Sequence, residues 1–376
     1  MPRTTAKRAT RKVNVAVVGL GFMGVTHLRA YQRISSARIC AVCDAVHRPK
    51  NGVLPGVSGN ITGHDAVQLG KQVKAYRSLE ELLADREIEL VDLCVPTPQH
   101  HPQAIAALQA GKHVICEKPL ARSAVLARGI VRAAKSAKGF LMPAMCLRFW
   151  PEWAWLKEAV DHKQFGKVLA ARFRRVSEPP GWSRRSYFDG AASGGALLDL
   201  HIHDADFIQF LFGRPSSVFA SGLTRFSGAT DHVVAQYKVA NGATVSAEGS
   251  WLMTEGHGFS MAYTVNFERA TADYDSARGS EALRLFKEGQ PPRVIRCKGP
   301  NGYERELRYF IGCILAGTRP TVVTVQDGLS AVEICEAEER SVRTGKVVAL
   351  SRNDAVGIGE HTRPRVVQTG ALAGRY

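Results

Sequence analysis

The sequence predicts an α/β protein in which a doubly wound parallel sheet is followed by a C-terminal α+β domain with a largely antiparallel open sheet. A glycine-rich turn follows the first apolar segment, and strands and helices then alternate up to about residue 148. From residue 149 onward, strands follow one another without long intervening helices. Alternation is typical of a parallel sheet, whereas consecutive strands favour an antiparallel one. At 376 residues the chain is long enough for two domains.

The composition is that of a soluble globular protein, with 45% apolar and 22% charged residues. No apolar run approaches the roughly 18 residues that a membrane span needs, so we expect no membrane partner. The basic segment 1–12 lacks the features of a secretory signal, and we expect a disordered arm there and a cytoplasmic protein. The eight cysteines lie mostly among apolar neighbours, which indicates buried thiols rather than disulfides or zinc ligands.

The formal net charge is +16, a value that would suit nucleic-acid binding. However, part of this charge belongs to the N-terminal arm, and the rest is spread along the whole chain. No helix-turn-helix, zinc finger or aromatic RNA-binding pattern accompanies it. We therefore expect no nucleic-acid partner, although the charge suits small anionic molecules or surfaces.

The first element is an apolar strand over residues 13–18, followed by Gly19, Gly21 and Gly24 in the spacing G-x-G-x-x-G. The first glycine allows the tight turn, the second lets the backbone approach a pyrophosphate, and the third lets a helix pack closely on the sheet. A helix over residues 23–34 would offer its N-terminal N–H groups to the phosphates. We expect Phe22 and Met23, inside this turn, to contact the cofactor as well.

A second strand over residues 37–43 ends in Asp44, which lies 20 residues after Gly24. A carboxylate at this position accepts hydrogen bonds from a ribose 2′-hydroxyl and repels a 2′-phosphate, so we expect NAD rather than NADP. Arg48 and Lys50 follow closely and leave NADP open. The glycine pattern alone also leaves open FAD, S-adenosylmethionine, or a turn without ligand.

The remaining elements of the first half continue the alternation. A Gly- and Asn-rich segment over residues 47–70 reads as an inserted loop, and Ser78 caps a helix over 79–83. A strand over 91–95 stops at Pro96-Thr97-Pro98, a helix over 101–110 follows, and a strand over 113–116 runs into Glu117-Lys118-Pro119. Ligand groups are expected where these parallel strands end.

In the second half, strands are expected over residues 167–176, 218–224, 233–239, 244–251 and 263–267. The strand over 233–239 alternates apolar with polar or small residues, which is typical of a sheet with one buried face. Its other face would suit contact between copies of the chain. A late helix covers 327–344, and the polar tail from 351 to 376 shows no periodicity.

Three separated motifs together resemble the glucose-fructose oxidoreductase / inositol dehydrogenase / MocA family of NAD(P)-dependent oxidoreductases. They are the glycine turn, the stretch from Pro96 to Leu120 with Ala-Gly-Lys-His-Val-Ile-Cys-Glu-Lys-Pro-Leu at its end, and the segment Gly-Gly-Ala-Leu-Leu-Asp-Leu-His-Ile-His-Asp-Ala-Asp over residues 194–206. The resemblance extends from about residue 13 to 350. It implies a Rossmann domain over 13–148, a substrate-binding and oligomerisation domain over 149–350 whose C-terminal helix can pack back on the first domain, and a homodimer or homotetramer.

The resemblance also implies roles for individual residues. Lys118 is expected between the nicotinamide ring and the substrate hydroxyl, His203 takes the hydroxyl proton, and Asp199 orients the sugar. A histidine suits this task because its pKa lies near neutral pH. Asp199 and His203 are four residues apart on a predicted helix and so share a face. On the nicotinamide-ribose side, the residues expected to hold the cofactor are Pro96, Thr97, His100, Glu117 and Lys118.

His201 departs from the commonest family pattern, in which a small residue occupies this position. It creates the run Asp-Leu-His-Ile-His-Asp over residues 199–204, which resembles the ligand set of some metal-dependent hydrolases. Within a helix, residues two apart point to different faces, so we expect no metal and place His201 at the domain interface or on the pocket wall. Further substrate contacts are expected from Arg148, Trp182 and Tyr187.

The expected activity is NAD-dependent, reversible oxidation of a secondary hydroxyl of a sugar, sugar derivative or cyclitol to a ketone. One alternative keeps the cofactor but makes the net reaction redox-neutral, as in an epimerase or eliminating glycosidase with tightly bound NAD. A second alternative is a non-catalytic, cofactor-binding regulator. The third is the metal-dependent hydrolase considered above.

Overall fold

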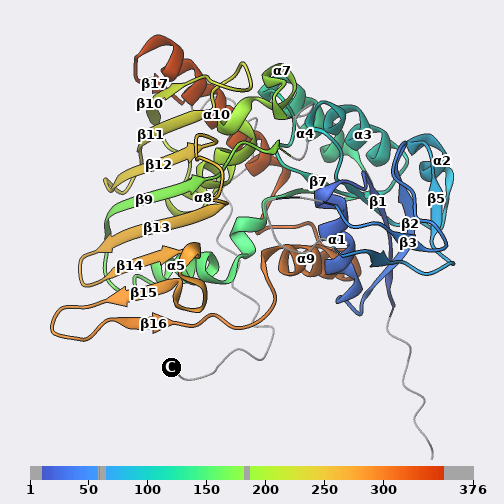
Figure 1. Ribbon diagram of the computed structural model, residues 1–376, viewed down its shortest axis with the longest axis horizontal. Coiled ribbons are helices and arrows are strands. Elements are labelled where there is room, and N and C mark those ends of the chain that lie inside the picture. Colours follow the sequence, from blue (N-terminus) through green and yellow to red (C-terminus); the bar gives the residue numbers. More distant parts are fainter. Residues whose placement is uncertain (1–10, 58, 60–64, 182–186, 351–376) are drawn as a thin grey trace, which may run out of the picture.

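In the computed structural model the chain forms two large sheets that stand side by side, each with its own helices (Figure 1). The structure describes residues 11–57, 59, 65–181 and 187–350. Within these residues, no helix combines the length and apolar character that crossing a membrane requires.

The first sheet contains six parallel strands in the order β5-β2-β1-β6-β7-β8. Their bounds are β1 Val13–Val18, β2 Ala37–Cys43, β5 Lys74–Tyr76, β6 Leu90–Leu93, β7 His113–Glu117 and β8 Leu141–Ala144. The central strands are mostly apolar and buried, with Asn14 in β1 and Asp92 in β6 as polar exceptions, because helices cover the sheet on both faces. The order reverses at β1, so the strand-end loops of β1 and β6 diverge and leave a crevice for a ligand.

The helices of this half are α1 (Phe22–Gln32), α2 (Leu79–Ala84), α3 (Thr97–Gln109) and α4 (Ala124–Ser136). As expected, the hydroxyl of Ser78 accepts from the N–H of Glu81 at 3.3 Å and caps α2. The segment expected to be a plain loop contains the two-residue strands β3 (Val53–Leu54) and β4 (Val67–Gln68), which pair with each other.

The second sheet contains nine strands in the order β16-β15-β14-β13-β9-β12-β11-β10-β17. Their bounds are β9 Val168–Val176, β10 Ser217–Leu223, β11 His232–Lys238, β12 Thr244–Ser250, β13 Ser260–Phe267, β14 Thr271–Asp275, β15 Leu283–Phe286, β16 Arg293–Ile295 and β17 Val348–Ala349. Only β9 and β12 pair in parallel, and every other pair of neighbours is antiparallel. The predicted fold class is therefore confirmed.

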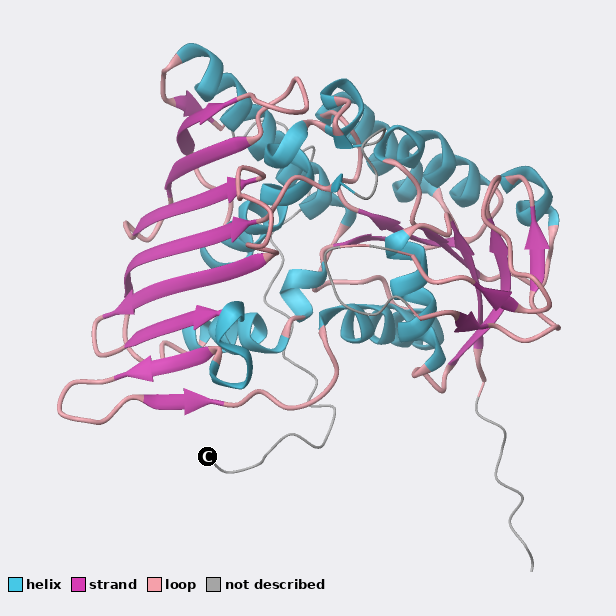
Figure 2. Cartoon of the chain, in the orientation of Figure 1, coloured by secondary structure: helices cyan, strands magenta, loops and turns pink. Residues whose placement is uncertain are grey.

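Helices cover one face of this second sheet, and the other face stays open (Figure 2). Further helical elements are η1 (Cys146–Phe149), α5 (Pro151–Asp161), α7 (Gly190–Ser193), the π-helix η3 (Leu197–His201), α8 (Ile202–Phe212), η4 (Ser276–Glu281), α9 (Gly302–Ala316) and α10 (Val325–Thr344). Trp153 of α5 is fully buried and packs on Phe173, Phe207 and Tyr263. The two late helices lie against the first half, α9 on α1 and α10 on α4.

Candidate active site

A cavity of about 1320 Å³ opens where the parallel strands end and extends to the second half of the chain. Most of the residues expected to hold the cofactor line it: Gly19, Gly21, Phe22, Met23, Asp44, Pro96, Thr97, Glu117 and Lys118. Tyr187 and Asp199 of the second half complete the wall. The cavity therefore joins the strand ends of the first sheet to the helical segment that carries Asp199.

The backbone of the glycine turn shapes one end of this cavity. Gly19 has a φ of +88°, a conformation that favours glycine. A Cβ atom at Gly24 would lie 1.9 Å from the carbonyl oxygen of Gly19, so only a glycine allows the helix to begin this close to the turn. At Gly21, nothing lies within 4 Å of the place a Cβ would occupy, which leaves the backbone open toward the cavity. These features fit a pyrophosphate.

Asp44 stands at the end of β2 with its carboxylate held by the backbone. One oxygen accepts from the N–H of Leu20 at 2.7 Å, and the other accepts from the N–H groups of Val46 and His47 at 2.7 and 2.8 Å. Each carboxylate oxygen has two acceptor sites, so this arrangement orients Asp44 and leaves capacity for ribose hydroxyls. His47 and Arg77 also line the cavity here, and sequence analysis did not single them out.

His100 does not line the cavity; it is buried and ties two strand-end loops together. Its Nδ1 lies 2.7 Å from the carbonyl oxygen of Pro119, and its Nε2 lies 2.8 Å from that of Val95. His100 thus positions the loops that carry Pro96 and Lys118 and does not itself border the cavity.

Lys118 and Asp199 meet across the cavity from the two halves of the chain. The Lys118 ammonium donates to the Asp199 backbone carbonyl at 2.6 Å and to the Asp199 carboxylate Oδ1 at 3.1 Å. Both side chains are partly exposed, Lys118 at 14% and Asp199 at 18%. An ammonium has three donors, so one N–H remains for a ligand in the cavity.

His203 follows Asp199 by four residues, but the helix between them is not regular. Residues Leu197–His201 form a π-helix, a rare conformation that often occurs at functional sites, and α8 continues from Ile202. Burial, and then the positive charges of Lys118 and Arg175, hold the pKa of His203 well below its ordinary value. The imidazole is therefore neutral at neutral pH, as a proton acceptor must be.

His201 points the other way, into the core of the second half. Its Nε2 lies 2.9 Å from the Tyr237 hydroxyl and 3.2 Å from the Glu338 carboxylate. The neighbouring strand can approach because residue 249 is a glycine, where a Cβ atom would lie 2.5 Å from the Cβ of His201. His201 is thus not on the pocket wall, because its imidazole lies among Tyr237, Glu338 and the backbone at Gly249.

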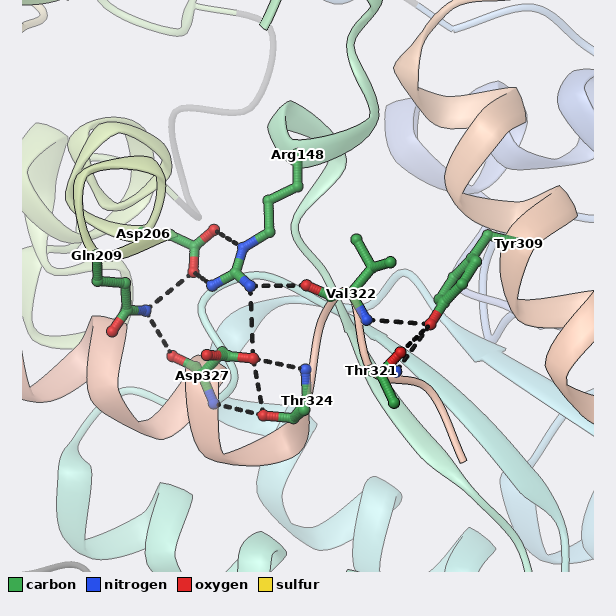
Figure 3. A network of polar contacts seen from close by, with 8 residues as sticks. All are labelled: Arg148, Asp206, Gln209, Tyr309, Thr321, Val322, Thr324 and Asp327. Atoms are coloured by element: carbon green, nitrogen blue, oxygen red, sulfur yellow. Dashed lines mark hydrogen bonds and ion pairs between the residues drawn. The ribbon is translucent and has the colours of Figure 1, made fainter. Parts of the chain in front are cut away.

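Arg148 also lies away from the cavity, in a buried polar network that joins η1, α8 and α10 (Figure 3). Its guanidinium donates to both oxygens of Asp206, at 2.8 and 2.6 Å, and to the carbonyl of Val322 at 2.7 Å. Asp327 lies 3.4 Å from the same group. With its donors committed in this way, Arg148 supports the junction of these elements, which corrects its expected contact with substrate.

Of the two aromatic residues expected to contact substrate, only Tyr187 lies among the described residues. Tyr187 lines the cavity, and its ring stands edge-on to Trp251, with centroids 5.9 Å apart. Trp182 lies outside the described residues. Trp251 follows β12 directly and was expected only as the end of a strand.

Comparisons with known proteins agree with this architecture. The family model described as "Oxidoreductase family, NAD-binding Rossmann fold" matches residues 13–145, and the one described as "GFO/IDH/MocA C-terminal domain" matches residues 153–273. The two matches follow each other along the chain in the order of its two sheets.

Several curated proteins and solved structures are similar over nearly the full length. An inositol 2-dehydrogenase of Mycolicibacterium vanbaalenii is 26% identical over 372 residues, which cover 92% of this chain and 98% of the relative. A myo-inositol 2-dehydrogenase of Thermotoga maritima is 27% identical over 90% of this chain and 98% of its own length. A solved levoglucosan dehydrogenase in complex with NADH and L-sorbose has a TM-score of 0.77, with 22% identity over 91% of this chain and 99% of that one, and shows the same fold.

Proposed function

The chain belongs to the GFO/IDH/MocA family of NAD-binding oxidoreductases, and from this premise we propose that it oxidises a secondary hydroxyl of a sugar, sugar derivative or cyclitol to a ketone, reversibly, with NAD. The observation that carries the proposal is the contact of Lys118 with Asp199 on the wall of the cavity that the glycine turn also lines. The relatives named as inositol dehydrogenases support a polyol or cyclitol as substrate.

The residues divide the chemistry between them. NAD, when bound, supplies the acceptor for the hydride that leaves the carbinol carbon. His203, neutral because burial lowers its pKa, takes the hydroxyl proton as the hydride leaves. Lys118 donates a hydrogen bond to the reacting oxygen with the N–H that Asp199 does not use, and so stabilises the negative charge that develops there. Asp199 holds the ammonium in place and offers its second carboxylate oxygen to a neighbouring hydroxyl.

The wall opposite the cofactor end suits a ring with several hydroxyl groups. Tyr187 presents an aromatic surface backed by Trp251, and aromatic faces pack on the apolar C–H surface of sugar rings. The carboxylate of Asp199 and the ammonium of Lys118 are the polar groups that would fix the orientation of the ring.

We also propose that the open face of the second sheet is an interface between copies of the chain, in a homodimer or homotetramer. Partly exposed apolar side chains project from neighbouring strands on this face, among them Phe219 and Leu223 of β10 and Val234 of β11. Burial of such residues between two sheets would contribute favourably to association.

The direct test is a panel of sugars, sugar acids and cyclitols, incubated with purified protein and either NAD or NADP, with NADH or NADPH absorbance as the readout. We expect NADH to accumulate with at least one polyol. Product formed without net NADH would indicate the redox-neutral reaction instead. If the protein binds neither cofactor, the proposal is wrong.

A further inference from the structure

A buried polar cluster lies behind the wall of the cavity, centred on His27 of α1. The side chain of His27 is fully buried. Its Nδ1 lies 2.8 Å from Oδ2 of Asp92, at a hydrogen-bonding distance, and its Nε2 lies 3.2 Å from Oε1 of Glu117, an electrostatic contact. The Cys94 thiol also contacts Asp92, at 3.3 Å. The proposed reaction gives His27 and Asp92 no role.

This geometry favours a charged imidazole. A neutral histidine carries one N–H, so one of its nitrogens would turn a lone pair toward a carboxylate. The imidazolium has N–H groups at both nitrogens and suits both Asp92 and Glu117. Burial lowers the pKa of His27, but the negative charge of Asp92 and the contacts with its neighbours raise it well above the ordinary value. Burial in turn raises the pKa of Glu117, but His27 and then Lys118 bring it below the ordinary value.

Among the residues that the structure describes, the other groups around His27 do not supply a second cation. Tyr31 of α1, Cys94 after β6, and Tyr303 and Glu306 of α9 complete the surroundings. Glu306 is fully buried, neither of its carboxylate oxygens has a hydrogen-bond partner among the described residues, and burial raises its pKa well above the ordinary value. Burial without a partner thus favours the protonated form of Glu306, and the carboxylates that contact His27 are those of Asp92 and Glu117.

Glu117 is the charged member of this cluster that reaches the cavity. It lines the wall next to Lys118, and its Oε2 accepts from the Lys118 backbone N–H at 3.0 Å. Asp92 and His27 are sealed behind it. The ionised carboxylate of Glu117 is therefore the charge of this cluster that borders the cavity, at the same strand end that carries Lys118.

We infer that His27 is a positioning residue that keeps the Glu117 carboxylate ionised and fixed at the wall of the cavity, so that Glu117 favours bound oxidised NAD over NADH. The physical reason is that the oxidised nicotinamide ring is a cation and the reduced ring is neutral, so a nearby carboxylate stabilises only the oxidised form. This inference rests on the proposed function only in taking NAD as the cofactor.

The test compares the dissociation constants of NAD, by calorimetry, and of NADH, by fluorescence, for the wild-type protein, His27→Gln, Glu117→Gln and the double variant. Without its cation, the buried Glu117 would take up a proton. We therefore expect His27→Gln to weaken NAD on the order of tenfold, the equivalent of one pKa unit, with NADH changed by less than about threefold. Glu117→Gln should do the same. The double variant should be no weaker than Glu117→Gln, because His27 acts through Glu117.

Tyr31→Phe is the matched control, because it removes a buried hydroxyl near Asp92 and changes no charge. The ratio of its dissociation constants for NAD and NADH should equal that of the wild type. His27→Asn is a second variant with the same expectation, should His27→Gln fail to fold. Equal weakening of NAD and NADH in the His27 variants, or additive effects in the double variant, would overturn the inference alone. A wild-type protein that binds neither form would overturn the proposed function with it.

Discussion

Two ion pairs, Lys118–Asp199 and Arg148–Asp206, join the first half of the chain to a helical segment of the second half, and they differ in how deeply they are buried. Lys118 and Asp199 meet on the cavity wall with side chains 14% and 18% exposed, whereas Arg148 and Asp206 are 3% and 1% exposed. Arg148 makes two hydrogen bonds to Asp206 and one to a backbone carbonyl. Lys118 keeps a donor for a ligand. The same kind of ion pair can thus contribute to ligand binding where a hydrogen-bond donor remains free, as at Lys118. Where the donors are used within the protein, as at Arg148, it contributes to the structure.

The two pairs also sit on one helical segment. Asp199 lies in the π-helix η3 and Asp206 in α8, so the buried pair anchors the helical segment that carries Asp199 on the cavity wall. Arg148 is a positioning residue in this sense, at a distance from the reacting groups. Changes to the first pair should therefore alter rate, and changes to the second should alter stability.

The largest effect should come from Lys118→Met. Removal of the donor at the reacting oxygen is expected to lower kcat by about 10²- to 10⁴-fold, the usual range for a positioned proton donor or acceptor. The thermal midpoint should change little, since the side chain borders the cavity. Steady-state rates with the best substrate of the polyol panel measure the effect. A variant within threefold of the wild type would remove Lys118 from the chemistry.

Arg148→Met should instead reduce the free energy of unfolding, by about 3–5 kcal/mol, because it leaves Asp206 buried without its partner. Urea unfolding followed by circular dichroism measures this loss. Arg148→Lys, which keeps the charge but not the bidentate geometry, should lie between the variant and the wild type. A stability equal to the wild type would show that the network in Figure 3 contributes little.

Asp199→Asn and Asp206→Asn form a matched pair that separates the two roles. In Asp199→Asn the amide oxygen still accepts from Lys118 but the ion pair is lost, so kcat/KM should fall on the order of tenfold with stability retained. The asparagine at 206 should lower stability and leave the rate of the folded protein near that of the wild type. Kinetics and urea unfolding of both variants provide the comparison, and identical profiles would contradict it.

The smallest effect concerns pH and His203. The pKa of His203 is lowered well below 6.5 in the folded protein, so at pH below about 6.5 the unfolded chain binds a proton that the folded one does not. Stability therefore falls as the pH decreases through this window, by at most about 1.4 kcal/mol per pH unit. Urea unfolding at pH 7.5 and 5.5 should show a smaller loss for His203→Gln than for the wild type. An equal loss in both would place the proton elsewhere.

Local sequence patterns were sufficient to predict many of the elements in the first half of the chain. The strands Val13–Val18 and Ala37–Cys43 have the predicted bounds, because continuous apolar runs ended by turn residues have few alternatives. The short edge strand Lys74–Tyr76 and the strands β14 to β16 were missed. Lys74 and Ala75 of the edge strand are exposed, so its composition carries no strand pattern, and only the neighbouring strand creates it.

The residues of the candidate site were likewise predicted only in part. Glu117 and Lys118 follow a strand of a parallel sheet, and the topology brings such strand ends to one edge, where the cavity lies. Arg148 was expected to contact substrate, and His201 to lie at the domain interface or on the pocket wall; both are buried away from the cavity. Their directions depend on a π-helical turn and on partners such as Glu338 and Asp206, which lie 58 or more residues away in the chain.

The sequence by itself determined the fold class, the glycine turn and the chemical types gathered at the strand ends, since these follow from periodicity and spacing along the chain. Only the tertiary structure decided which cations are free and which are committed, and that His27 stands between Asp92 and Glu117. The physical reason is that burial and charge pairing depend on distances between segments remote in sequence, and these distances set the protonation state of each group.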